Sequence, residues 1–360
     1  MADRPATDAL VALFLCQAHK FTAEVSQSSL PLKAVFCHCD TYRHTTGALY
    51  TSYVPWPCDC NAIRGSSLRR YDLFDSFGIL FCDTCSSPMF FERKGAEQRT
   101  LTYGASSGIL SHVDVKSLVQ ITDHICVGDT IDGGACPWLR NVNANASGEA
   151  RLWLPNDATD IPVDEIPIRC ACRRVDLVFR KPTAEYASQP RSKLPWFIDP
   201  VTNKSSGGFD VCGSGRLSSE ADFSIELIAA VTAEDRDPRW VTLTCYASSA
   251  DVRRYFCSKC SACVFYAADD RPEMVHISIR LLESPDGTRA KGLVPWNFGG
   301  PHVWRQDVAV EHTADIWRGR RAYPKNWRRI LREHAAKELT SQWLRSARLC
   351  VYGCRRYASP

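Results

Sequence analysis

The chain has 360 residues, of which 45% are hydrophobic, a formal net charge of +4, and 18 cysteines. This length can bury two hydrophobic cores and exceeds that of one ordinary domain, so we expect two domains. The basic residues accompany no recognised nucleic-acid module, which argues against a nucleic-acid partner. The apolar run 9–16 is too short for a membrane span and lacks a basic leader, so we expect a cytoplasmic protein with no membrane partner. The thiols of such a protein are metal ligands or buried side chains rather than disulfides.

The first half of the chain alternates short predicted strands with cysteine-bearing loops. Residues 10–25 predict a strand, a turn and a second strand, and Cys16 lies where the first strand ends. A later strand runs into the tight polar loop that begins Cys37-His38-Cys39. Another strand leads into Cys82-Asp83-Thr84-Cys85, a turn that brings two thiols together. We interpret residues 8–140 as one module.

The second half repeats this order. Cys170-Ala171-Cys172 comes before an alternating strand, and Cys257-Ser258-Lys259-Cys260 follows much later. Because each short pair lets two thiolates reach the same ion, the four thiols can surround one Zn²⁺. Residues 141–167 are rich in Asn, Asp and Pro and predict a linker, so the second module spans 168–318. We expect both modules to be mainly antiparallel β with few helices.

A helical extension is predicted at the end of the chain, over residues 319–360. Apolar residues recur there at steps of four and would form one stripe: Trp327, Leu331, Ala335, Leu339 and Trp343. We expect this helix to pack against a module or against a second subunit of a homodimer, and not to bind a membrane.

The ordered thiol motifs resemble those of the glutathione-dependent formaldehyde-activating enzyme family, also called the centromere-protein-V-like domain. In the first module the matching motifs are Cys37-His38-Cys39-x-x-Tyr42-Arg43-x-x-x-Gly47 and Phe81-Cys82-x-x-Cys85-x-Ser87-Pro88. In the second they are Cys170-x-Cys172, Arg216 and Phe256-Cys257-x-x-Cys260. The resemblance covers residues 10–317 and implies two tandem, Mss4-like, zinc-stapled β modules. It also implies a carbon–sulfur lyase that uses Zn²⁺ and a thiol such as glutathione.

By this resemblance each module has a structural zinc site. The second module keeps the full set: Cys170, Cys172, Cys257 and Cys260. The first module keeps Cys16, Cys82 and Cys85, but Phe14 stands where another cysteine is expected. Either a neighbour such as His19 completes this site or its zinc binds weakly. Spacing alone also allows a competing arrangement, in which Cys37 and Cys39 join Cys82 and Cys85.

The resemblance also implies a reactive zinc site, near which a thiol adduct is handled. The first module keeps Cys37 and Cys39, while Tyr42 replaces the third cysteine. The second module has only Cys212, with Asp210 and Gly215 at the other two positions, so its reactive site is expected to be lost.

The altered loop of the first module carries several groups that can act on a substrate. Zinc held by two thiolates retains Lewis acidity. Tyr42 could bind the metal as phenolate or act as a general acid or base. His38 and His44 could move protons, and Arg43 could hold a carboxylate or enolate. The alternative is that the histidines are solvated or capping residues and that Arg43 pairs with an acidic side chain.

Three functional hypotheses follow. The first is a zinc-dependent enzyme acting on a small activated carbonyl compound or thiol adduct, diverged towards isomerisation, decarboxylation, dehydration or cyclisation in secondary metabolism. The second is a non-catalytic, zinc-stabilised binding protein that presents Trp304, Trp317, Arg318 and Arg320 to a partner. The third puts the active site between the modules, where His124, Asp129 and Asp132 could face the other half.

Overall fold

The computed structural model has two β-rich halves, and a short helix of the first half packs between them. The described residues are 6–13, 16–57, 60–95, 101–106, 110–111, 119–136, 164–190, 192–194, 198, 202, 204–205, 207–210, 218–224, 228–230, 242–248, 250, 252–268 and 274–296. The predicted C-terminal helix and the Trp304 to Arg320 surface lie outside these residues, as does most of the predicted linker.

The first half contains two sheets. The three-stranded sheet has the order β2 (Lys20–Ser26), β1 (Thr7–Leu13) and β9 (Leu110–Ser111). The seven-stranded sheet has the order β10 (Val119–Ile125), β3 (Leu32–Cys37), β4 (Thr51–Pro55), β8 (Leu101–Ser106), β7 (Pro88–Lys94), β6 (Phe77–Phe81) and β5 (Arg69–Phe74). Its pairs are antiparallel except for β10 and β3, which run parallel. This parallel pair brings the carboxyl ends of β3 and β10 to the same edge.

The second half also contains one three-stranded and one larger sheet. The small sheet has the order β11 (Glu165–Arg169), β12 (Asp176–Arg180) and β15 (Ile228–Ala230). The six-stranded sheet has the order β13 (Gly207–Asp210), β14 (Ser218–Ser224), β19 (Met274–Ser278), β18 (Cys263–Ala268), β17 (Val252–Cys257) and β16 (Leu243–Ala247). All of its pairs are antiparallel.

Helices are few and short in the described residues. The α-helices are α1 (Asp40–Thr46), α2 (Asn61–Arg64) and α3 (Ala184–Ala187), and the 3-10 turns are η1 (Gln27–Ser29), η3 (Val127–Asp129) and η6 (Ile279–Leu281). The prediction of a mainly β protein with few helices is therefore confirmed.

The period-two patterns in the sequence correspond to strands with one buried face. In β2, for example, Phe21, Ala23 and Val25 are buried while the residues between them are exposed. The predicted linker is wrong at its end, because β11 begins at Glu165 and pairs with β12. Ile166 in that strand is fully buried, so burial of an alternating apolar pair decides the structure there rather than the turn-forming composition.

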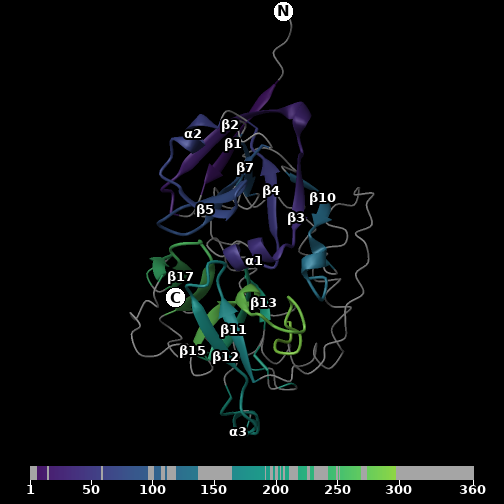
Figure 1. Ribbon diagram of the computed structural model, residues 1–360, viewed down its shortest axis with the longest axis vertical. Helices are drawn as coiled ribbons and strands as arrows, with labels where there is room; N and C mark the ends of the chain where they lie inside the picture. Colours follow the sequence, from purple (N-terminus) through teal and green to yellow (C-terminus); the bar gives the residue numbers. More distant parts are fainter. Residues whose placement is uncertain are drawn as a thin grey trace, which may run out of the picture.

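Helix α1 lies between the two halves, with the first-half sheets on one side and β11 to β19 on the other (Figure 1). The backbone N–H of Ala171 donates to the carbonyl oxygen of His44, and Ser261 Oγ donates to the carbonyl oxygen of Thr45. Gly47 ends the helix with a φ of 78°, and a Cβ there would lie 2.5 Å from the carbonyl oxygen of Cys263. The two halves are therefore in close contact where α1 faces the second half.

The segment from Asp40 to Thr46 is helical, which corrects the prediction that it forms a loop. Cys39 caps its first turn, because its thiol accepts from the backbone N–H of Tyr42. Gly47 supplies the left-handed residue at its other end. These caps outweigh the low helix propensity of the three threonines in the segment. Among the described residues, no helix is both long and apolar enough to cross a membrane.

Candidate metal and substrate sites

The four cysteines of the second half converge on one point. The Sγ atoms of Cys170 and Cys172 are 3.6 Å apart, and those of Cys172 and Cys257 are 3.5 Å apart. All four Sγ atoms, with that of Cys260, lie within 4.8 Å of one another. Four sulfurs at about 2.3 Å from a tetrahedral zinc are roughly 3.8 Å apart, so the group fits Zn²⁺. The hydrogen bond from Cys170 lowers the pKa of Cys172 to about 7, and a bound zinc would displace the protons of these thiols.

The first half has a matching set of three thiols. The Sγ atoms of Cys16 and Cys82 are 3.6 Å apart, and that of Cys85 completes the group. His19 comes within 4.8 Å of Cys82, but the structure does not place it within that distance of all three thiols. Among the described residues, no group of ligand atoms within 4.8 Å joins Cys82 or Cys85 to Cys37 or Cys39, so the competing arrangement finds no support here and stays a prediction.

The two C-x-x-C turns have the same hydrogen bonds. Ser86 donates its backbone N–H to the carbonyl oxygen of Cys82, and Ser261 does the same to Cys257. Both serines have a left-handed backbone, with φ of 60° and 66°. The turns also touch, because Ser86 Oγ donates to the carbonyl oxygen of Ser261 at 2.6 Å. Two similar thiol turns therefore meet back to back at the junction.

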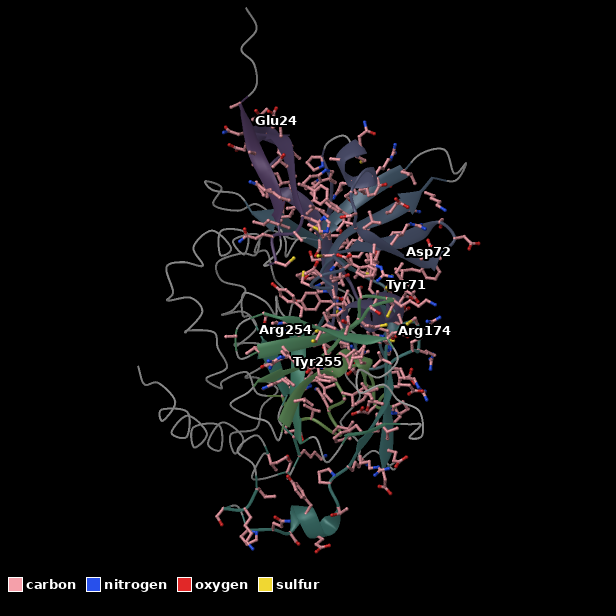
Figure 2. All side chains as sticks on the ribbon, turned by 90° about the vertical axis from the view of Figure 1, so that its left-hand side faces the viewer. Glu24, Tyr71, Asp72, Arg174, Arg254 and Tyr255 are labelled. Atoms are coloured by element: carbon pink, nitrogen blue, oxygen red, sulfur yellow. The ribbon has the colours of Figure 1, made fainter. Side chains whose placement is uncertain are left out.

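A tyrosine from each half lies near the thiols of the other half. Burial and the Cys170–Cys260 thiol group together raise the pKa of Tyr71, in β5, to about 12. Burial and the Cys16 group likewise raise the pKa of Tyr246, in β16. In the view of Figure 2, Tyr71 lies at the level of the junction, and it lines a pocket with Cys170 and Arg173 of the second half. Both thiol groups are thus near the interface rather than at the outer ends of the molecule.

Cys37 and Cys39 form a hydrogen-bonded thiol pair at the start of α1. The hydrogen bond between them raises the pKa of Cys37 and lowers that of Cys39, and burial raises both. The backbone N–H of Tyr42 donates to Cys39 Sγ at 3.4 Å and further lowers the pKa of Cys39. Cys39 is therefore the thiol of this pair that ionises first.

A third thiol at this site was not predicted. Cys126 follows β10 and has a φ of 55°. Its side chain therefore does not continue the alternation of side chains between the two faces of the strand. Burial raises its pKa, whereas a hydrogen bond with Cys37 lowers it. In the sequence the signal was weak, because a cysteine after a short strand is usually a buried small side chain.

Tyr42 packs beside the thiol pair in an aromatic cluster. Its ring lies 4.7 Å from that of Phe91 and 5.7 Å from that of Phe77, in edge-to-face contacts. Its hydroxyl is buried and has no hydrogen-bond partner among the described residues. Burial, with the neighbouring Tyr53 and thiols, raises its pKa well above the usual range. In the absence of a metal the group is therefore a protonated phenol.

Two buried arginines meet near α1, one from each half. Arg43 is 1% exposed and Arg280, in η6, is 2% exposed. Arg43 Nη2 donates to the carbonyl oxygen of Asp129 at 3.0 Å, and the guanidinium pairs with the Asp40 carboxylate. Nε and Nη1 of both arginines are buried with no acceptor among the described residues. Burial lowers the pKa of Arg43 to about 10, so it remains charged near neutral pH.

His44 is directed away from the thiol pair and towards the second half. Its Nδ1 lies 2.9 Å from the carbonyl oxygen of Arg169, and burial lowers its pKa. It lines a pocket of about 230 Å³ with Asp40, Tyr71, Cys170 and Glu283. Proton transfer by His44 at the thiol pair stays a prediction.

His38 belongs to a different group of ligand-type side chains. Its Nε2 is 2.9 Å from His124 Nδ1, and Cys136 Sγ lies 3.4 Å and 3.3 Å from these two nitrogens. His38 and Cys136 are buried and His124 is half-buried. Burial, His124 and two arginines hold the pKa of His38 well below its usual range, so the ring is neutral.

Strand alternation puts this group on the opposite face of β3 from the thiol pair. Phe36 and His38 face Tyr50 and His124, with ring centroids 4.6 to 5.9 Å apart. Cys37 instead packs with Tyr42, Ile79 and Phe91. The sequence indicates no role for Cys136, and it groups His124 with Asp129 and Asp132 rather than with His38.

The two halves are linked by a buried ion pair at Asp132. Its carboxylate accepts from Thr288 Oγ1 at 2.7 Å and from the backbone N–H and Nε of Arg289 at 2.7 and 3.2 Å. Burial acts to raise the pKa of Asp132, but Arg289 and these hydrogen bonds outweigh it and the pKa is lowered. The segment around Asp132 therefore faces the other half, as the third hypothesis expected. Cys212 and Gly215 lie outside the described residues.

Comparison with known proteins gives one match, in the first half. Residues 13–122 match the sequence profile of the family described as glutathione-dependent formaldehyde-activating enzyme. No curated protein and no solved structure matches the chain. The match runs from the end of β1 to the middle of β10 and includes Cys16, Cys37, Cys39, Cys82 and Cys85. This part of the chain is thus similar to that enzyme family.

Proposed function

We propose that the protein is a zinc-dependent enzyme whose reaction takes place beside Cys37 and Cys39. Its substrate is a small activated carbonyl compound or a thiol adduct, including an adduct of glutathione. We further propose that the reaction has diverged from formaldehyde–glutathione chemistry towards isomerisation, decarboxylation, dehydration or cyclisation of a secondary metabolite. The second half contributes a similar module that has kept its structural thiols.

The observation that carries this proposal is a thiol pair beside the buried Arg43, with a second buried arginine, Arg280, close to Arg43, and unused N–H donors on both. Buried N–H donors without acceptors are costly, so the Nε and Nη1 groups of Arg43 and Arg280 are suited to an anionic ligand. A carboxylate, an enolate or a thiolate can accept from their Nε and Nη1 groups. The family match over residues 13–122 supports the same location, because it contains both cysteines and Arg43.

Cys37, Cys39 and Cys126 are the residues that would hold the zinc of this site. The donor types fit, since thiolates are preferred zinc ligands and the pKa of Cys39 is lowered. The three thiols are not among the groups of described residues whose ligand atoms all lie within 4.8 Å of one another, so zinc binding would have to draw them together. When bound, zinc would act as a Lewis acid on a substrate oxygen or sulfur.

The remaining steps belong to side chains of this chain. Arg43 and Arg280 would bind and orient the anionic part of the substrate through their free N–H groups. Because the raised pKa keeps Tyr42 protonated, its hydroxyl would donate a hydrogen bond to a developing oxyanion. Phe77 and Phe91 pack edge-to-face against the Tyr42 ring and would keep water away from this side chain.

Turnover of two defined probes tests the proposal. The hemithioacetals that glutathione forms with formaldehyde and with methylglyoxal represent a simple thiol adduct and an activated carbonyl compound. We expect Cys39→Ala and Tyr42→Phe each to lower kcat/KM by roughly 100-fold or more on any probe that reacts. Cys245→Ala is the matched control, because that thiol is exposed and belongs to none of the groups above. Unchanged turnover in folded Cys39→Ala protein would refute the assignment.

A further inference from the structure

We propose that His38, His124 and Cys136 form an additional metal site, which binds a borderline first-row divalent cation such as Zn²⁺. The site is separate from the Cys37–Cys39 thiols and from both C-x-x-C turns. It includes two residues, Cys136 and His124, that lie outside the region matched by the family profile.

The distances between the three facing atoms carry the proposal. The triangle has edges of 2.9, 3.3 and 3.4 Å between Nε2, Nδ1 and Sγ. Around a tetrahedral zinc with bonds of about 2.05 Å to nitrogen and 2.3 Å to sulfur, these edges would be roughly 3.3 and 3.6 Å. The Cys170 group shows the same close convergence, with sulfurs 3.5 and 3.6 Å apart. Imidazole and thiolate are both ligands that zinc prefers.

The position of each ligand is fixed by the fold. Parallel pairing of β3 with β10 sets His38 beside His124, and the backbone N–H of His38 donates to the carbonyl oxygen of Ile125. Cys136 comes from the following loop, whose turn is closed by a hydrogen bond from its own backbone N–H to the carbonyl oxygen of Gly133. Gly134 is left-handed, and a Cβ there would lie 3.4 Å from His38 Nδ1, so glycine permits this close approach.

The second half holds this loop in place. Asp132 Oδ1 accepts from the backbone N–H of Gly134 at 3.0 Å and from Thr288 Oγ1 at 2.7 Å. The carbonyl oxygen of Asp132 accepts from Arg289 Nη2 at 2.5 Å. Cys136 is therefore preorganised by contacts across the junction, which is the condition for a tight metal site.

A hydrogen bond between the two imidazoles accounts for the 2.9 Å edge, but it does not account for the thiol that faces the same two nitrogens. A hydrogen bond between the two imidazoles uses one proton, and the thiol must then approach the same two nitrogens. His38 Nδ1 is buried and has no partner among the described residues, whichever nitrogen carries the proton. The unpaired Nδ1 therefore costs free energy with or without an ion. A metal ion, however, would bind the lone pairs of His38 Nε2, His124 Nδ1 and Cys136 Sγ at the same time.

Three protein ligands leave a fourth position, as in catalytic rather than structural zinc sites. His124 is half-buried, so this position can be reached from the side of β10. Arg43 and Arg280 both act electrostatically on His38. They favour an anion, such as hydroxide or a substrate carboxylate, as the fourth ligand.

Metal content of the full chain tests the site. After zinc loading and removal of excess metal, His124→Ala and Cys136→Ala should each bind one equivalent less than wild type. Cys245→Ala, which removes an exposed thiol outside every group, should bind as much as wild type. Cys136→His keeps three ligands and should retain the metal. The Cys37→Ala, Cys39→Ala double variant should also retain this ion, so failure of the proposed active site and failure of this site are distinguishable.

A measurement on the unaltered site covers the case in which the variants do not fold. X-ray absorption of the zinc-loaded protein should show imidazole scattering, since the other proposed sites offer thiolates. The measurement is made in His19→Ala protein, because His19 lies within 4.8 Å of Cys82. Purely sulfur coordination there, or wild-type metal content in folded His124→Ala protein, would overturn the inference.

Discussion

Cys39 acts both as the cap of α1 and as the more acidic thiol of the reactive pair. Its Sγ accepts from the backbone N–H of Tyr42, and its hydrogen bond with Cys37 stabilises the thiolate. The helix therefore begins at the group that the proposed reaction requires. A substitution at this position affects both local structure and thiol chemistry, so thiol chemistry should be tested directly.

Alkylation of the zinc-stripped protein provides that test. Because the pKa of Cys39 is lowered in the folded state, its thiolate persists at pH values below the ordinary thiol range of about 8.5. The rate of iodoacetamide labelling at Cys39, followed by mass spectrometry, should have its pH midpoint below that of the same cysteine in urea. An equal or higher midpoint in the folded protein would contradict the assigned hydrogen bonds.

Spacing in the sequence could predict some of these residues and not others. The sequence groups four of these cysteines correctly, because the short spacing within each pair brings its two thiols close together: Cys170, Cys172, Cys257 and Cys260. The His38–His124–Cys136 group could not be predicted, because its members come from three segments. His38 and His124 are 86 positions apart and meet only through the parallel pairing of β3 and β10.

Helix α1 shows how an element of two turns can determine the contact between the two halves. It is short and rich in threonine, and Thr45 and Thr46 bond the carbonyl oxygens of Thr41 and Tyr42. Local propensity therefore does not predict it. Its caps and its contacts with β11 and η6 stabilise it, and these contacts are visible only in the folded molecule.

Gly47→Ala should disrupt this element. The residue has a φ of 78°, and the added Cβ would lie 2.5 Å from the carbonyl oxygen of Cys263 and 2.8 Å from Ser278 Oγ. Backbone strain and overlap together should lower the free energy of unfolding by about 2 kcal/mol or more, measured by urea denaturation. Gly128→Ala is the control, since nothing lies within 4 Å of its Cβ position. Equal stability of the two variants would show that α1 is not tightly packed against the second half.

At the scale of the whole molecule, Asp132 and Arg289 connect the halves through a buried ion pair. Arg289 is fully buried, and the Asp132 carboxylate accepts from both its side chain and its backbone. Removing one partner of such a pair leaves an uncompensated charge in the interior. The pair therefore fixes how the two halves join and also holds the loop that carries Cys136.

Asp132→Asn should reduce stability in a pH-dependent way. The folded pKa of Asp132 is lowered, so its contribution is complete above the unfolded value of about 3.9 and is lost as pH falls through the folded pKa. The variant should be about 3 kcal/mol less stable at pH 7, and the difference should shrink at pH 3. Asp72→Asn, which affects an exposed pair with Arg70, should change stability by less than about 1 kcal/mol. A difference that grows on acidification would contradict this account.

The sequence predicted the β class, and the two halves have comparable sets of sheets and thiol turns. Duplication of one zinc-stapled module stays a prediction, supported by the equal hydrogen bonds of the two C-x-x-C turns. How the halves meet could not be predicted, because Asp132, Thr288 and Arg289 carry no motif. Asp132 and Arg289 are 157 positions apart in the sequence, and they are brought together only when the two halves pack against each other.

The metal content of the full chain tests the central claim most directly. Zinc per chain is measured by elemental analysis for wild type and for the Cys37→Ala, Cys39→Ala double variant, with circular dichroism as the check on folding. We predict that wild type binds zinc beyond that of the Cys170 group, and that the folded double variant binds one equivalent less. Identical zinc content in the two folded proteins would contradict a metal at the proposed reaction site.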